Sequence, residues 1–398
     1  MPAAPTFNIL MYSHDTYGLG HIRRTMAIAQ HLRGPGVNVL ILTGSPLVGR
    51  FDFPEGVDFV RIPGMIKNTN EDYLPLSIRI NAKHALNIRR NIIVATAKAF
   101  QPQMFIVDKA PLGLKREVMP TLKWLKRRMP QTKTILGLRD IMDDALTTRT
   151  EWREKGIYEV LDRYYSEIWV YGNQELYDPV REYEIPESIS AKMLFTGYIP
   201  RFLPPRGMIA EVRQEQCLAK KEKLVVVTTG GGGDGYPLMD AYLRMLESWP
   251  SPPFKTILVS GPFMSKAMRE DVHRRSLKVR TRFYHFFRRM ELLIGLADAV
   301  VSMGGYNTTC EILAQGKPSL VIPREEPRLE QRIRAEMLKK HGLIDFMPWA
   351  ELTPETLREK VMGLIENPGN CCGAVADFPF TGLEVMSRRL GEFRGLLT

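Results

Sequence analysis

Residues 297–323, ADAVVSMGGYNTTCEILAQGKPSLVIP, contain the pattern on which the fold prediction rests. A strand-like apolar run ends at Ser302, and Gly304 and Gly305 form a turn. A helix is predicted to begin near Asn307–Thr309, because hydroxyl and amide side chains suit an N-cap. A second apolar run closes the stretch. This succession of strand, glycine turn, helix and strand is typical of a parallel sheet covered by helices.

The same alternation runs through both halves of the chain. The strand-like runs are FNILMYS, NVLILTG, VDFVRIPG, MFIVD, TILGL, EIWVYG and MLFTGY in the first half, and LVVVTTG, FKTILVSG, LKVRTRFY, AVVSMGG and PSLVIPR in the second. Several are apolar throughout, as expected for strands that helices cover on both faces. The sequence therefore predicts an α/β protein with two doubly wound, Rossmann-like domains.

The length of 398 residues exceeds what one ordinary core accommodates, so two domains are expected. The segment TGYIPRFLPPRG contains prolines that break regular structure, and it marks the boundary. We predict a first domain over residues 1–197 and a second over 198–380. Residues 381–398 are predicted to form a C-terminal helix that packs back on the first domain.

Composition indicates a globular cytoplasmic protein. The N-terminus lacks the charged and apolar regions of a signal peptide, and no apolar run approaches the ~20 residues of a membrane span. The four cysteines show no CxxC spacing. The seven histidines are scattered, and the pair Asp143–Asp144 stands without a second acidic motif, so we expect neither a metal nor another cofactor.

Net charge is concentrated in one stretch. Residues 77–133 contain thirteen Lys and Arg against the two acids Asp108 and Glu117, a surplus of eleven that equals the net charge of the whole chain, +11. Basic residues interleaved with apolar ones suit an anionic membrane surface, here at the inner face of the membrane, or a phosphorylated acceptor. A solvated helix face explains the pattern equally well. No nucleic-acid-binding signature accompanies it, so nucleic acid is not an expected partner.

The first glycine turn, YGLGHIRR at 17–24, follows a strand and precedes a helix. Gly18 and Gly20 permit close approach of a ligand to the backbone, and His21 lies at the helix N-terminus, which favours an anion. A tight turn with a surface histidine is the alternative. His14 and Asp108, each near a strand end, are secondary candidates, for which a structural role is equally plausible.

The second glycine turn contains Gly230–Gly233, which leave almost no side chains between a strand and the next helix. Such a loop favours a phosphate or a ribose, although a flexible structural loop is the alternative. It matches neither the P-loop lysine pattern nor the dinucleotide fingerprint. Glu311, predicted in the first turn of its helix, is placed to accept both ribose hydroxyls or, alternatively, to complement the helix dipole. Glu330 and Gln331 lie at a comparable level in the next unit.

Most of the chain resembles the family 28 glycosyltransferases of the GT-B fold, of the MurG type, and the resemblance is strongest over residues 281–343, which contain RFYHFFRRMELLIGLADAVVSMGGYNTTCEILAQGKPSLVIP. The resemblance implies an acceptor domain and a donor domain facing across a cleft. It implies an inverting, metal-independent transfer from a UDP-linked sugar such as UDP-N-acetylglucosamine to an acceptor hydroxyl. It does not identify the acceptor.

The resemblance also assigns roles. Glu311 corresponds to the residue that holds the ribose, the backbone of Phe287 to the contact with the base, and Gln331 to a contact with the sugar. The donor-binding residues it implies are Gly231, Gly232, Gly233, Gly235, Phe287, Gly304, Gly305, Asn307, Thr308, Glu311, Glu330, Gln331 and Arg201, the last as a phosphate contact. His21 is the expected base, because a histidine suits proton removal near neutral pH. The acceptor or phosphate loop comprises Gly18, Gly20, Arg23, Arg24, His14 and Asp108, with one of the two arginines facing solvent.

Two departures keep alternatives open. The first loop differs from the GGTGGH of the MurG type, and its G-x-G-H-x-x-R pattern is closer to a MurG-like UDP-sugar hydrolase of pseudaminic acid synthesis. The sugar-facing HKDRQQ pattern is replaced by EEPRLEQ. A UDP-sugar hydrolase, a GT-B-type sugar-nucleotide 2-epimerase and a non-catalytic nucleotide-sugar sensor are the alternatives. The basic stretch favours transfer to a large anionic acceptor.

Overall fold

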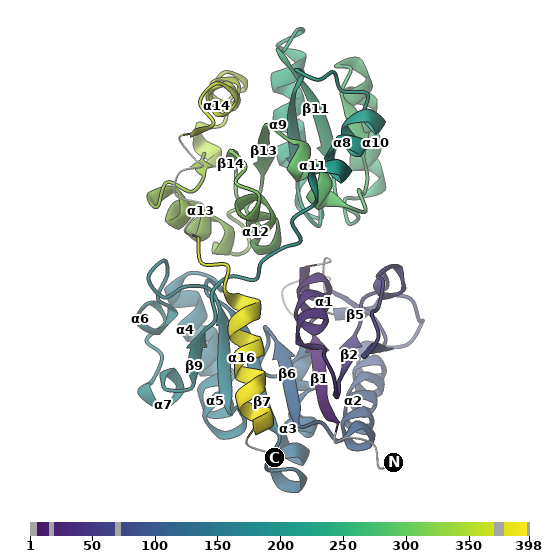
Figure 1. The fold of residues 1–398 in the computed structure, drawn as a ribbon, viewed down its shortest axis with the longest axis vertical. Helices are drawn as coiled ribbons and strands as arrows, with labels where there is room; N and C mark the ends of the chain where they lie inside the picture. The colour runs from purple at the N-terminus through teal and green to yellow at the C-terminus, as the bar shows by residue number, and fades with distance from the viewer. Residues whose placement is uncertain (1–5, 16–19, 68–72, 370–377, 396–398) are drawn as a thin grey trace. The chain divides into compact units, whose positions relative to one another are not determined.

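The computed structural model describes residues 6–15, 20–67, 73–369 and 378–395. The chain forms two compact units (Figure 1): the first comprises Met1–Ile199 and Pro379–Thr398, and the second comprises Pro200–Phe378. The division thus follows Ile199, whereas the sequence prediction put it after residue 197. The C-terminal helix α16 (Gly382–Gly395) belongs to the first unit, where it packs against α1 (Gly20–Leu32).

The first unit contains a parallel sheet in the order β3-β2-β1-β6-β7-β8-β9. Its strands are β1 (Phe7–Ser13), β2 (Val37–Thr43), β3 (Val57–Arg61), β6 (Met104–Asp108), β7 (Lys133–Arg139), β8 (Glu167–Tyr171) and β9 (Met193–Phe195). Its further helices are α2 (Ala82–Phe100), α3 (Met119–Arg128), α4 (Ala145–Glu154), α5 (Ile157–Tyr164), α6 (Pro179–Glu182) and α7 (Glu187–Ser190), with the short 3-10 helices η1 (Val48–Arg50) and η2 (Leu114–Arg116).

Both faces of this sheet are covered, which explains why its central strands are apolar throughout. Every residue of β6 is buried, and so is every residue of β1 except Asn8. Helices α2, α3 and α5 pack on one face, and α1 and α16 lie together on the other (Figure 1). The strand alternation read from the sequence missed a small antiparallel hairpin, β4 (Met65–Lys67) with β5 (Tyr73–Pro75).

The second unit contains a second parallel sheet, in the order β12-β11-β10-β13-β14-β15. Its strands are β10 (Lys223–Thr228), β11 (Phe254–Val259), β12 (Arg282–Tyr284), β13 (Ala299–Ser302), β14 (Ser319–Val321) and β15 (Asp345–Phe346). Its helices are α8 (Arg206–Glu215), α9 (Tyr236–Glu247), α10 (Lys266–Lys278), α11 (Met290–Leu296), α12 (Tyr306–Ala314), α13 (Glu330–Lys340) and α14 (Pro354–Glu366), with the 3-10 helix η3 (Trp349–Glu351). Helices α9, α10 and α14 cover one face, and α8, α11 and α12 cover the other.

Each sheet has one topological switch point, where neighbouring strands lead the chain in opposite directions. In the first unit it lies between β1 and β6, and in the second between β10 and β13. Open parallel sheets bind ligands beyond the carboxyl ends of their strands at such points. The loops that follow these four strands are therefore where a site is expected in each unit.

Candidate functional site

The switch point of the first unit brings two predicted residues together. Asp108 is the last residue of β6, and His21 lies at the start of α1, after β1. The Nδ1 atom of His21 is 2.5 Å from Oδ2 of Asp108. Arg24, one helical turn after His21 on the same face of α1, donates to Oδ1 of Asp108 from Nη2 at 2.6 Å and from Nε at 3.1 Å. Asp108, predicted only as a secondary candidate, is thus the common partner of the other two side chains.

Burial and charge set the protonation of this cluster. Burial lowers the pKa of His21 to about 4, although the Asp108 carboxylate opposes that change. Burial alone would raise the pKa of Asp108, but Arg24 and His21 hold it well below its usual range. Near neutral pH the imidazole is therefore neutral and the carboxylate ionised. Because Asp108 accepts the hydrogen on Nδ1, the lone pair of His21 is on Nε2, as a general base requires.

His14 belongs to a second buried network, which local sequence could not reveal. Nδ1 of His14 lies 3.3 Å from the hydroxyl of Tyr12, which donates to Oε1 of Glu117 at 2.6 Å. Arg89 donates to the same carboxylate, from Nε at 2.7 Å and from Nη2 at 2.5 Å. Burial holds the pKa of His14 well below its ordinary value. The rings of His14 and His21 meet edge to face, with centroids 5.8 Å apart.

The remaining predictions for the first loop have mixed outcomes. Gly18 lies outside the described residues, and Gly20 is the first residue of α1. Of the two arginines, Arg23 is half-buried and so keeps partial access to solvent, whereas Arg24 is only 2% exposed. The helical period directs Arg24 toward β6 rather than outward, so its guanidinium engages Asp108.

In the second unit the glycine loop after β10 is closely packed against the backbone that follows β11. Gly232 has φ +89°, and a Cβ there would stand 2.0 Å from the carbonyl oxygen of Ser260. Gly231 accepts a hydrogen bond from the backbone N–H of Phe263 at 2.9 Å, and Gly233 is half-buried. Gly235 is the N-cap of α9. The loop therefore places the N-terminus of a twelve-residue helix at the carboxyl edge of the sheet.

The loop after β13 differs in one detail from the prediction. Helix α12 begins at Tyr306 with Gly305 as its N-cap, and no side chain caps it, so Asn307 and Thr308 lie inside the first turn. The helix starts early because Gly305 already has the extended backbone of a cap residue, with φ −62° and ψ 139°. Glu311 consequently lies in the second turn, not the first, and it is 2% exposed. Gly304, with φ +72°, makes the turn.

Contacts between loops hold the predicted donor residues at one edge. Arg324, which follows β14, forms ion pairs with Asp234 of the glycine loop (2.9 Å) and with Glu330 of α13 (3.1 Å). The backbone N–H of Arg324 donates to Oε1 of Gln331 at 3.1 Å. The sequence analysis missed Arg324 and Asp234. The sequence did contain a signal for Asp234, because a carboxylate is unexpected beside a glycine run that is predicted to bind phosphate.

Two further predicted residues belong to the second unit. Phe287, in the loop after β12, is half-buried, and its ring meets that of Tyr284 edge to face at 5.2 Å. Arg201, in the segment that opens this unit, is also half-buried. Among the described residues, no group of three or more His, Cys, Asp or Glu side chains could hold a metal ion.

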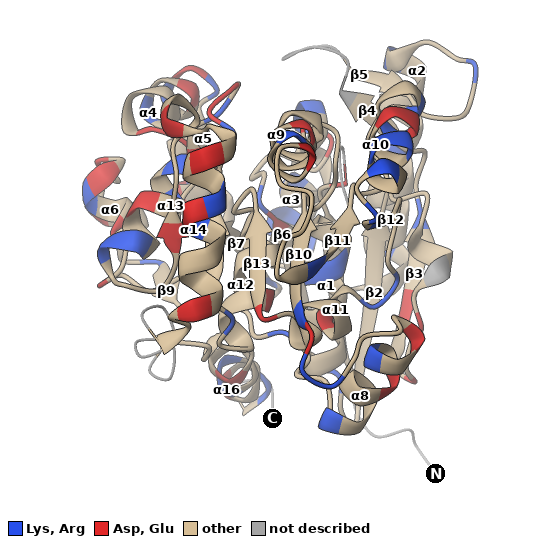
Figure 2. Cartoon of the chain, turned by 90° about the horizontal axis from the view of Figure 1, so that it is seen from above, with Lys and Arg blue, Asp and Glu red and all other residues tan. Residues whose placement is uncertain are grey.

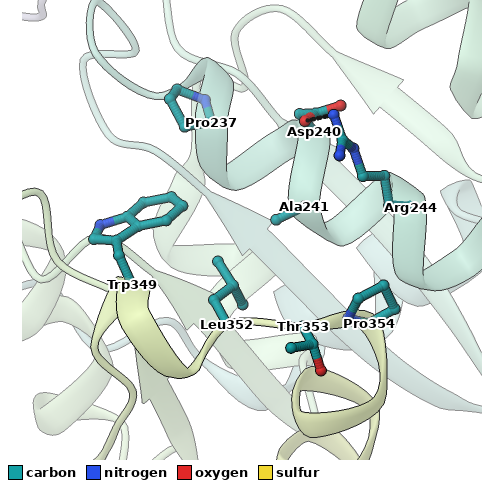
Figure 3. A pocket seen from close by; sticks show the side chains of 8 residues that line it. All are labelled: Pro237, Asp240, Ala241, Arg244, Trp349, Leu352, Thr353 and Pro354. Carbon is teal, nitrogen blue, oxygen red and sulfur yellow. Dashed lines mark ion pairs between the residues drawn. The ribbon is translucent and has the colours of Figure 1, made fainter.

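A surface pocket of the second unit contains none of the predicted donor residues (Figure 3). It is lined by Pro237, Asp240, Ala241, Arg244, Trp349, Leu352, Thr353 and Pro354, from α9, η3 and the start of α14. Asp240 and Arg244 form an ion pair with each other at 3.0 Å. The pocket is therefore distinct from the edge where the glycine loop, α12 and α13 meet.

The surface of the basic stretch combines positive charge with exposed apolar groups. Both of its acids are buried, whereas acidic and basic residues are mixed along α4, α5 and α13 (Figure 2). Its one fully buried basic side chain among the described residues is Arg89, which pairs with Glu117. The strand β5 packs on α2, and the exposed apolar side chains on and around β4, β5 and α2 are Ile66, Leu74, Leu76, Ile78 and Ile88. No described helix is long and apolar enough to cross a membrane.

Comparison with known proteins is consistent with this architecture. Residues 224–371 match the family described as "Glycosyltransferase family 28 C-terminal domain". A UDP-N-acetylglucosamine–N-acetylmuramyl-(pentapeptide) pyrophosphoryl-undecaprenol N-acetylglucosamine transferase of Mycolicibacterium vanbaalenii is 30% identical over 107 residues, which are 27% of this chain and 27% of that protein. The protein of the same name from Alkaliphilus oremlandii is 24% identical over 136 residues, 34% of this chain and 37% of that one. The matched segments thus span little more than a third of these relatives at most.

Solved structures match over nearly the whole chain. The glycosyltransferase of kitacinnamycin has a TM-score of 0.64 at 14% identity, covering 99% of this chain and 100% of that one. MurG of Acinetobacter baumannii has a TM-score of 0.60 at 12% identity, covering 98% and 100%. At such low identity these likenesses establish the fold. This chain therefore has the GT-B fold of these glycosyltransferase structures, and residues 224–371 of its second unit match the glycosyltransferase family 28 C-terminal domain.

Proposed function

We propose that this protein is an inverting glycosyltransferase that moves a sugar from a UDP-linked donor, of the UDP-N-acetylglucosamine type, to an acceptor hydroxyl. The observation that carries the proposal is that the glycine loop after β10, α12 with Glu311 after β13, and the start of α13 after β14 lie at one edge of the sheet, beside its switch point. The names of the curated relatives support the choice of donor.

In this proposal the second unit binds the donor. Glu311 accepts hydrogen bonds from the ribose hydroxyls, and backbone near Phe287 contacts the base. The glycine loop and the N-terminus of α9 receive the diphosphate, with Arg201 as a further cation. Developing negative charge on the leaving nucleotide is thereby stabilised without a metal ion, so addition of EDTA should leave turnover unchanged.

The first unit supplies the base. His21 removes the proton of the acceptor hydroxyl at Nε2 as the oxygen attacks the anomeric carbon and the bond from that carbon to the diphosphate breaks. Asp108 stabilises the imidazolium that results, because it already accepts the hydrogen on Nδ1. Arg24 keeps Asp108 ionised. The proton is then on His21, the sugar is on the acceptor oxygen, and the nucleoside diphosphate leaves.

The experiment is a pair of substitutions followed by calorimetry with UDP and by UDP release from UDP-N-acetylglucosamine. Glu311→Ala should weaken UDP binding by about tenfold or more, since hydrogen bonds to a charged group contribute about 1.5–3 kcal/mol. His21→Ala should leave UDP affinity unchanged and lower turnover by about two orders of magnitude or more. Unchanged UDP affinity in the first variant or near-normal turnover in the second would contradict these roles.

Acceptor dependence separates transfer from the alternatives. A transferase should release UDP much faster when a lipid extract containing acceptor is added. Release at full rate without any acceptor would instead support a UDP-sugar hydrolase. Exchange of the C2 hydrogen with no UDP release would support a 2-epimerase.

We also propose that the β5–α2 surface contacts an anionic membrane or lipid-linked acceptor. Leu74 and Ile78 are 46% and 44% exposed, and the nearby Arg79 and Lys83 are exposed as well. Apolar and basic side chains together favour anionic lipid surfaces. The protein should therefore co-sediment with phosphatidylglycerol vesicles and should not co-sediment with phosphatidylcholine vesicles. The variant Leu74→Ser/Ile78→Ser should lose this binding while UDP affinity is retained.

A further inference from the structure

The ion pair between Arg324 and Asp234 joins two loops of the proposed donor site. Asp234 belongs to the glycine loop after β10, and Arg324 follows β14, two strands away in the sheet. The guanidinium lies between the carboxylates of Asp234, 2.9 Å from Nε, and Glu330, 3.1 Å from Nη2. Arg324 is 18% exposed, whereas Asp234 is 46% exposed. Of the carboxylates that pair with Arg324, that of Asp234 is thus largely open to water.

Asp234 places a negative charge in the loop that is proposed to bind the diphosphate. Asp234 directly precedes Gly235, the N-cap of α9, so its carboxylate lies where helix N-termini attract anions. A diphosphate bound by this loop would bring further negative charge close to that carboxylate, and like charges at short range repel. The carboxylate must therefore be neutralised or displaced when the diphosphate arrives.

A second arginine shows that the same edge has donors that the protein itself does not use. Arg334 of α13 is 1% exposed, and its Nη1 donates to the carbonyl oxygen of Gly304 at 3.1 Å. Its Nε and Nη2 have no hydrogen-bond partner among the described residues. A buried guanidinium with unused donors is costly unless an anion compensates it. The positive charge at this edge therefore exceeds what the nearby ion pairs require.

We propose that Arg324 binds the diphosphate of the donor, and that Asp234 occupies the same guanidinium in the free protein as an internal substitute for that anion. This inference rests on the proposed function. On binding, the diphosphate replaces Asp234 at Arg324, while Glu330 continues to hold the guanidinium from α13. Asp234 thus weakens donor binding, and the ion pair closes the site when it is empty. An exposed carboxylate suits this exchange, because surface ion pairs contribute little stability.

The test is calorimetric titration of the full chain with UDP, and with uridine as the ligand that lacks phosphates. Asp234→Asn should tighten UDP binding by about threefold or more, since loss of a competing surface ion pair is worth up to about fivefold. Arg324→Ala should weaken it by about tenfold or more, as expected for a charge-assisted hydrogen bond. Neither change should alter uridine affinity.

The double variant Asp234→Asn/Arg324→Ala tests the exchange itself. Without Arg324 the substitution at Asp234 should produce a smaller gain than it does in the wild type. An equal gain in both backgrounds would mean that Asp234 only repels the ligand, and it would overturn the exchange. Unchanged or weaker UDP binding by Asp234→Asn would also overturn it. If Asp234→Asn weakened UDP binding in the presence of Mg²⁺ but not in the presence of EDTA, Asp234 would be a metal ligand instead.

Matched controls lie on α9 and α13, the helices that follow the loops of Asp234 and Arg324. Asp240→Asn removes a carboxylate of α9 that pairs with Arg244 and Arg275 (Figure 3 shows the pair with Arg244), and Arg332→Ala removes a cation of α13 that pairs with Glu336. Both should leave UDP affinity unchanged, and an effect equal to that at Asp234 or Arg324 would reduce the result to general charge. If the wild type does not bind UDP, the proposed function fails. If it binds UDP but the variants behave like their controls, only the exchange fails.

Discussion

Glu117→Gln should destabilise the first unit far more than an ordinary loss of charge. Glu117 and Arg89 are both fully buried, and they are joined by hydrogen bonds of 2.7 Å and 2.5 Å. Nη1 of Arg89 also donates to the carbonyl oxygen of Pro63 at 2.6 Å. The substitution leaves the guanidinium without a counter-charge and sets an amide N–H₂ against the donors of Arg89 or Tyr12.

The expected loss is about 3–5 kcal/mol, the range found when one partner of a buried ion pair is removed. Total stabilities of about 5–15 kcal/mol make this a large fraction. Two effects act together: an uncompensated buried charge, and hydrogen-bond donors left without an acceptor. Replacing both residues, as in Arg89→Met/Glu117→Leu, should recover at least half of the loss, because a well-packed apolar pair often matches a buried ion pair.

The assay is urea unfolding followed by tryptophan fluorescence in a Trp249→Phe/Trp349→Phe background. The remaining tryptophans, Trp124, Trp152 and Trp169, all lie in the first unit, so the signal reports that unit alone. Glu151→Gln is the matched control, because its i,i+4 pair with Lys155 is exposed and should contribute no more than about 0.5 kcal/mol. A loss below about 1 kcal/mol for Glu117→Gln, or a double variant no better than the single one, would refute the reasoning.

Three further outcomes are expected. Asp108→Asn should lower turnover by about 10²- to 10⁴-fold, because an amide facing Nδ1 of His21 favours the tautomer with hydrogen on Nε2. UDP affinity measured by calorimetry should stay unchanged. Normal turnover would show that Asp108 has no part in the mechanism. Gly232→Ala should abolish UDP binding or lower the melting temperature, since φ is +89° and the new Cβ would stand 2.0 Å from the Ser260 oxygen; normal behaviour in both measurements would contradict that packing. Burial raises the pKa of Asp15 from an ordinary 3.8 to about 6, so the folded state holds a proton that the unfolded chain has released, and this stabilisation is lost as pH rises through about 6. Between about pH 4.5 and about pH 7.5 the wild type should lose about 2 kcal/mol more unfolding free energy than Asp15→Asn, and parallel pH profiles for the two proteins would refute the shift.

Local pattern was sufficient to predict the glycine turns and the strands of both parallel sheets except β15. Continuous apolar runs and the turns that follow them are local consequences of burial on both faces of a parallel sheet. The start of α12 was misplaced by a few residues, because Gly305 caps the helix by its backbone conformation and not by its side chain. The hairpin β4–β5 was missed.

Contacts between residues far apart in the sequence could not be predicted from local pattern. Asp108 lies 87 positions from His21, and Glu117 lies 105 from Tyr12. Nothing at Asp108 itself separates a carboxylate that orients a base from one that merely ends a strand. Arg24, one of the two arginines considered for an acceptor phosphate, engages Asp108, because burial forces a charge to find a partner within reach.

From its residues alone this chain could be recognised as two doubly wound α/β domains with a glycine turn at each expected ligand edge, since those features depend on neighbours in sequence. The order of the strands decided the rest. By placing β6 beside β1 and β14 beside β13, the sheets brought Asp108 to His21 and Arg324 to Asp234. Such pairings depend on the long-range packing that buries the strands. The pairing with Asp108 leaves the lone pair of His21, the proposed base, on Nε2.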